Sequence, residues 1–123
     1  MTRSARLAPP NSIILVLDTL ASLEIPELVN QNRRIWGSAT AVVIGCLAEM
    51  DGETEVHLGW QKEVDPGSAP SFVGRLETPS GVVSVVTVLK KVVLSLDVRK
   101  KSIAVHIWTN DPSEPTEVLI GVS

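Results

Sequence analysis

Residues 82–108 decide the fold, and they read VVSVVTVLKKVVLSLDVRKKSIAVHIW. Two short basic segments, 89–91 and 99–101, divide this stretch into three β-rich runs. In the runs 92–98 and 102–108, aliphatic residues alternate with other residues, and this period of two is typical of a half-buried strand. Parallel strands need a long crossover, whereas antiparallel strands accept short links. The stretch therefore predicts a three-strand antiparallel meander near the C-terminus.

The rest of the chain carries the same kind of signal at similar spacing. Glycine and proline clusters, including Asp51-Gly52 and the segment 78–81, separate the strand-like runs, and we interpret Asp51-Gly52 as the turn of a hairpin. We predict an all-β fold, an antiparallel β-sandwich or barrel of about eight strands. Pro26 fits the first turn of a short helix over 26–34, and an irregular loop is the alternative there. The predicted strands cover residues 12–18, 38–49, 54–60, 71–77, 82–88, 92–98, 102–108 and 116–122.

Length and composition indicate one domain. A chain of 123 residues is within the usual size of a single domain and can bury a core without disulfides or metals. Residues 1–11 contain Pro9 and Pro10 and little to bury, so we expect a flexible N-terminal tail followed by a single β domain over 12–123. Aromatic residues make up only 3% of the chain, and the core must therefore be built from Val, Ile and Leu.

Charge and hydropathy narrow the range of partners. The net charge is −3, which gives no electrostatic reason to expect binding to nucleic acid or to an anionic membrane. The apolar patch 13–17 is too short for a signal sequence, and no run has the length of a membrane span. The single cysteine, Cys46, lies in an apolar run, which suits a reducing compartment. We expect a soluble, cytoplasmic protein.

Few residues offer catalytic or metal-binding chemistry. His57 and His106 are the only imidazoles, and two histidines on strands of unknown adjacency do not complete a metal site of three or four ligands. They are weak metal candidates, and we predict no metal and no other cofactor. An apolar environment around Cys46 would raise the pKa of its thiol, which disfavours a nucleophilic role. No group of catalytic residues is evident in the sequence, and we therefore favour a protein that is not an enzyme.

One strand face is a candidate for binding another chain. Ala104, His106 and Trp108 alternate with the aliphatic stripe of their run, and Leu119 would extend this face if the last strand pairs beside it. Tryptophan is over-represented at the centres of protein interfaces. The alternative is that segment 19–35 of the same chain covers Trp108.

We therefore hypothesise a non-catalytic module that binds a protein partner or a second copy of itself as a dimer. An inhibitor, an immunity-type protein or a self-associating subunit would fit this description. A β-barrel that holds a small apolar ligand in its interior is the second hypothesis. A metal-dependent enzyme that uses His57 and His106 is the third and weakest.

Overall fold

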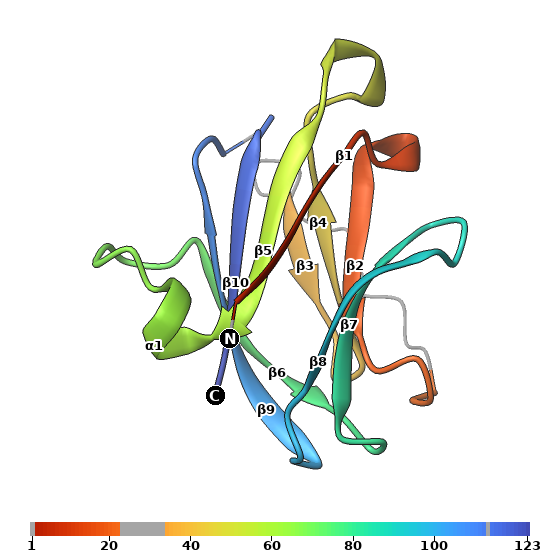
Figure 1. The fold of residues 1–123 in the computed structure, drawn as a ribbon, viewed down its shortest axis with the longest axis vertical. Coiled ribbons are helices and arrows are strands. Elements are labelled where there is room, and N and C mark those ends of the chain that lie inside the picture. The colour runs from red at the N-terminus through yellow and green to blue at the C-terminus, as the bar shows by residue number, and fades with distance from the viewer. Residues whose placement is uncertain (1, 23–33, 113) are drawn as a thin grey trace.

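In the computed structural model, which describes residues 2–22, 34–112 and 114–123, the strands form two five-stranded sheets packed face to face (Figure 1). This architecture is a β-sandwich, so the all-β prediction is confirmed. Sheet A has the order β1 (Arg3–Leu7), β5 (Thr54–Trp60), β10 (Glu117–Val122), β9 (Ser102–Thr109) and β6 (Phe72–Glu77). Sheet B has the order β3 (Ile35–Gly37), β4 (Ala41–Gly45), β2 (Ile13–Leu17), β7 (Val82–Thr87) and β8 (Val92–Asp97).

The two sheets share one aliphatic core. Alternate residues of the strands point inward, as the period of two predicts, and most of these side chains are inaccessible to solvent. Over the described residues the sheets do not close into a barrel, because each ends in separate edge strands. The barrel alternative is therefore wrong, and the interior is filled by the side chains of Ile14, Val16, Val42, Ile44, Val56, Leu58, Leu76, Val83, Val85, Ile103, Val105, Ile107, Val118, Ile120 and Val122.

The predicted C-terminal meander is only half correct. β7 and β8 pair as an antiparallel hairpin, but β9 belongs to the other sheet. The link 98–101 crosses between the sheets and is hydrogen-bonded to the link 78–81, which crosses in the opposite direction. Val98 N–H donates to the Gly81 carbonyl at 2.8 Å, and Arg99 adopts a φ of 54° that turns the chain out of sheet B. A short basic link can thus change sheets as readily as it closes a hairpin.

Two further expectations from the sequence are wrong. β4 and β5 lie in different sheets, so the segment around Asp51-Gly52, with the 3₁₀ turn η2 (Glu49–Asp51), is a crossover and not a hairpin. Residues 1–11 were expected to form a flexible tail, but Arg3–Leu7 is a strand that pairs antiparallel with β5, and the 3₁₀ turn η1 (Pro10–Ser12) leads into β2. This segment contains few apolar residues, but its backbone is held in place by pairing with β5.

The helical content of the described chain is small. One short helix, α1 (Gln61–Val64), follows β5 in the segment 61–70, which separates two of the predicted strands. The helix considered over 26–34 lies almost wholly in residues 23–33, outside the described residues. None of the helices described is long and apolar enough to cross a membrane.

Candidate functional site

The candidate residues from the sequence meet on the outer face of sheet A. Their strands alternate between core residues and outward residues, so the outward side chains of β5, β10, β9 and β6 lie in rows across the sheet. Leu119 on β10 pairs with His57 on β5 and with Trp108 on β9. In the next row, Gly121 lies between Gly59 and His106. This face has a half that the chain itself covers and a half that is open.

Helix α1 and the loop that follows it form the covered half. A Cβ atom placed on Gly121 would lie 2.8 Å from Val64 Cγ2 and 2.9 Å from Gln61 Cα, so α1 rests directly on the glycine. Trp108 packs beside it and is only 5% exposed, and its Nε1–H donates to the Ser68 carbonyl at 2.9 Å. The expectation that Trp108 is an exposed anchor is therefore wrong, because segment 61–68 covers it. The alternative assigned this role to segment 19–35, of which residues 23–33 lie outside the described residues.

The open half carries the other predicted interface residues. Ala104, His106 and Leu119 are half-buried. The rings of His106 and Trp108 stack with their centroids 6.1 Å apart, and His106 Nδ1 has no hydrogen-bond partner. Val73 on edge strand β6 pairs in register with His106 and is 57% exposed, which makes it the most exposed apolar side chain here. We name Val73, Ala104, His106 and Leu119 the open face; its burial against another chain stays a prediction.

A cluster of ionisable side chains adjoins the open face. β5 and β10 are parallel, with Glu55 directly opposite Glu117 and His57 two residues further along β5. One ligand atom from each of these three residues lies within 4.8 Å of the others. His57 Nε2 is 2.9 Å from Glu55 Oε1, and Arg6 Nη2 donates to Glu55 Oε2 at 2.9 Å. The hydrogen bond from Arg6 holds the pKa of Glu55 below its ordinary value, and His57 contributes in the same direction.

The two histidines thus differ in what surrounds them. His57 has two carboxylates beside it, whereas His106 is not in this cluster. Glu117 could not be found from the sequence, because it lies 60 positions from His57 and reaches it only through the parallel pairing of β5 and β10. The alternation of Glu117, Leu119 and Gly121 was a usable signal for the outward face, but no local spacing indicates which strand lies beside it.

Cys46 lies in the core, as expected. The side chain is 1% exposed, and burial raises the pKa of its thiol to about 11. At neutral pH the group is therefore a protonated thiol, and the thiolate that nucleophilic chemistry requires is scarce.

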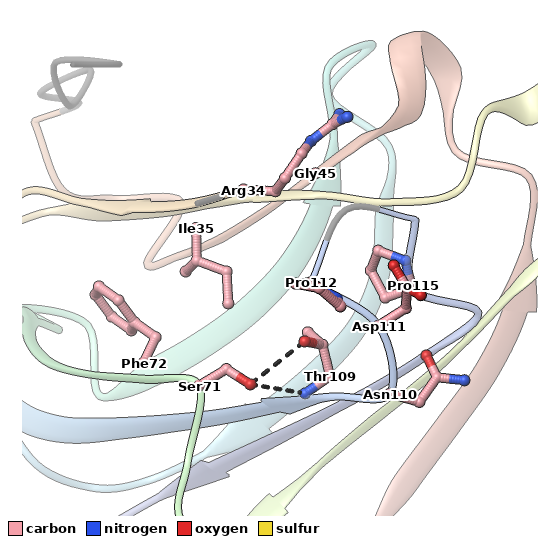
Figure 2. Close-up of a pocket in the computed structure, with 10 residues that line it drawn as sticks. All are labelled: Arg34, Ile35, Gly45, Ser71, Phe72, Thr109, Asn110, Asp111, Pro112 and Pro115. Atoms are coloured by element: carbon pink, nitrogen blue, oxygen red, sulfur yellow. Dashed lines mark hydrogen bonds between the residues drawn. The ribbon is translucent and has the colours of Figure 1, made fainter. Parts of the chain in front are cut away.

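A pocket of about 270 Å³ opens between the edges of the two sheets, beside β3 and β6. Figure 2 shows Ile35 and Phe72 on one side of it and the loop with Pro112 and Pro115 on the other, while the side chain of Arg34 points away. Ser71 Oγ lies 3.3 Å from Thr109 Oγ1 at its base. This volume is just below the usual range of small-molecule sites, so the pocket can hold one small apolar group.

Two solved structures resemble the chain over most of its length. The crystal structure of ComJ from Bacillus subtilis, described as the inhibitor of the DNA degrading activity of NucA, matches with a TM-score of 0.66 and 10% identity over 98% of this chain and 93% of that one. The protein described as crocagin biosynthetic gene J matches with a TM-score of 0.54 and 15% identity over 98% and 94%. No protein-family model and no curated protein sequence matches. At these identities the likeness shows the fold alone.

Proposed function

We propose that the chain is a non-catalytic module that binds another protein and inhibits it. The observation that carries this proposal is the similarity to ComJ, which extends over almost the whole of both chains. ComJ is described as an inhibitor of a DNA-degrading protein. Because a shared fold does not by itself imply a shared role, the proposal also needs a surface that suits a protein partner.

The open face is that proposed surface. Val73 on β6 and Leu119 on β10 supply apolar area on the two sides of β9, and the charged residues Arg75 on β6 and Glu55 on β5 flank it, as charged residues flank apolar area in other interfaces. The rigid sheet beneath holds the face in place, since the inward neighbours Ile107 and Ile120 are fully buried. Trp108 supports the face from within the chain and is not part of the contact.

The charge near this face favours a partner with a cationic surface. Backbone hydrogen bonds join the loops at one end of the sandwich: Glu55 N–H donates to the Thr116 carbonyl, and Leu47 N–H donates to the Pro115 carbonyl. Complementary charge accelerates association and selects among partners more than it adds affinity. The chain has 14 acidic and 11 basic residues, and the loops and strand ends at this end carry Glu49, Asp51, Glu53, Glu55, Asp111, Glu114 and Glu117.

Site-specific photo-crosslinking in the host cell tests the proposal. A photoreactive residue at position 73 should capture a specific protein, and the same residue at position 89 should not. Leu89 is a matched control because it is 74% exposed in the β7–β8 turn, away from the open face. The captured protein, once purified, should lose its activity when the chain is added.

Three other outcomes of the crosslinking experiment would change the proposal. Capture of a second copy of the chain would favour the self-associating subunit over the inhibitor. Capture from position 89 but not from position 73 would contradict the proposed surface, and a captured partner whose activity is unaffected would contradict inhibition. A cytoplasmic location belongs to the proposal as well, and the free, buried Cys46 is compatible with it.

A further inference from the structure

Sheet pairing concentrates three metal-ligating side chains on the outer face of sheet A. Parallel register places Glu55 and Glu117 side by side, although like charges directly opposite one another destabilise a sheet. His57 follows on the same face of β5, and its Nε2 atom points at Glu55. The two carboxylates concentrate negative charge at this point of the sheet; Arg6 offsets this charge at Glu55, and a bound cation would offset it at both residues.

The donor set suits a divalent transition-metal ion. The cluster offers three donor atoms, one imidazole nitrogen and two carboxylate oxygens. Zinc sites that keep an open fourth position also have three protein ligands. Metal–ligand bonds of about 2.0–2.2 Å place such donors roughly 3.3–3.5 Å apart. The donor atoms here lie within 4.8 Å of one another, and small rotations of the glutamate side chains would close the difference. An imidazole ligand favours zinc over magnesium, which prefers oxygen donors and retains its water.

A residue outside the cluster orients the histidine. Ser4 Oγ lies 2.7 Å from His57 Nδ1, and β1 holds it there because Ser4 is paired in register with His57. Metal-binding histidines usually engage their second nitrogen in this way, which fixes the ring and directs the other nitrogen at the metal. Ser4 is thus a positioning residue for His57.

The surroundings leave room for an ion and its water. A hollow of about 470 Å³ opens beside the cluster and is lined by Arg6, Glu53, Glu55, Asn110, Thr116 and Glu117. Arg6 competes for Glu55, but the arginine side chain is 65% exposed and can turn into solvent. Its departure would free Glu55 Oε2, while Oε1 lies 2.9 Å from His57 Nε2.

We propose that Glu55, His57 and Glu117 bind one divalent transition-metal ion at the edge of the open face. This site is independent of the proposed inhibition, since it requires only the folded chain. The bound ion would join β1, β5 and β10 through Ser4, His57 and the two carboxylates.

Zn²⁺ titration of the full chain by calorimetry tests the site. The parent should bind one Zn²⁺ per chain, and Mg²⁺ at the same concentration should bind more weakly. His57→Gln and Glu117→Gln should each weaken Zn²⁺ binding by about tenfold or more, and Ser4→Ala should weaken it by a smaller factor. Thermal melts without metal show whether each variant is folded. His57 and Glu117 are replaced separately, so if one variant does not fold, the other still tests the site.

Two matched controls separate this site from general attraction of cations. His106→Gln removes the other imidazole of the chain, and Glu77→Gln removes an exposed carboxylate on β6, at the far edge of sheet A from β1. Both should bind Zn²⁺ as the parent does. A parent that binds no Zn²⁺ would overturn the proposal, and so would His57→Gln and Glu117→Gln variants that bind it as tightly as the parent.

Discussion

The covered and open halves of the outer face of sheet A are built from the same strands but from different residues. Under α1, β5 and β10 carry Gly59 and Gly121, which face one another in register. Two residues earlier, the same strands carry His57 and Leu119, whose side chains keep part of their surface exposed. Glycine weakens a strand unless another backbone comes close to it. Paired outward glycines on neighbouring strands therefore mark a surface that the chain covers itself, and Trp108 beside them is buried under the same covering segment.

Among the variants that test this comparison, Trp108→Ala in the covered half should lower the free energy of unfolding most. Because Trp108 is 5% exposed and bonded to the Ser68 carbonyl, its loss should lower the free energy of unfolding by about 3–5 kcal/mol, as buried aromatic truncations do. Chemical denaturation measures this change. Acrylamide quenching gives an independent check, since Trp108 should be shielded in the folded parent. A loss of less than about 1 kcal/mol would show that segment 61–68 does not bury the tryptophan against sheet A.

Gly121→Ala should have a smaller effect in the same half. Its new methyl group would come within 3 Å of Gln61 Cα, a backbone atom, so α1 must shift, and overpacking of this kind costs about 1–3 kcal/mol. Gly59→Ala is the matched control, because the two nearest atoms to its new methyl group belong to the side chains of Thr2 and Val64, and the nearest backbone atom, Thr2 Cα, is further away, at 3.2 Å. Thermal and chemical unfolding should rank Gly121→Ala as the more destabilised variant. The reverse order would mean that α1 does not rest on β10.

The strand faces could be predicted from the sequence, and the sheet partners could not. Alternation identified Ile103, Val105 and Ile107 as core residues and Ala104 and His106 as outward residues, and all five are placed accordingly. Alternation depends only on the pleat of one strand, which is a local property. Alternation contains no information on which sheet a strand joins. The link 98–101, which crosses between the sheets, was therefore predicted to be a hairpin turn.

The candidate site was limited by the same lack of long-range information. His57 was a metal candidate with an incomplete ligand set, because Glu117 reaches it only through pairing between distant strands. Trp108 was predicted either to lie in an interface or to be covered by segment 19–35, since the segment that covers it, 61–68, has the composition of a loop. The outward glycines of β5 and β10 were the available signal that something packs there.

In the open half, Arg6→Gln should change the pKa of Glu55 with little effect on stability. The hydrogen bond from Arg6 is the main cause of the lowered pKa, so its removal should raise the pKa toward its ordinary value. A carboxylate with a lowered pKa stabilises the fold above its unfolded pKa, and this contribution disappears as the pH falls through the folded pKa. The variant should therefore lose less stability than the parent on acidification.

Carbon-detected NMR titration of the Glu55 carboxyl group measures this pKa directly. Arg75→Gln is the control, since Arg75 lies on β6 at the far edge of sheet A from β1. An unchanged pKa in Arg6→Gln would show that the ion pair at 2.9 Å does not persist in solution.

The smallest effect on stability should come from Val73→Asp, and its effect on binding should be the clearest in the open half. The side chain is 57% exposed on an edge strand, so the free energy of unfolding should change by no more than about 0.5 kcal/mol. A carboxylate in the apolar centre of an interface would be desolvated without a partner, which should weaken association with the captured protein by about tenfold or more. Leu89→Asp places the same charge at the 74% exposed turn position and should bind as the parent does. Titration calorimetry with the purified partner compares the three proteins. Equal affinity of Val73→Asp and the parent would remove the open face from the interface and leave both halves of this surface without an external partner.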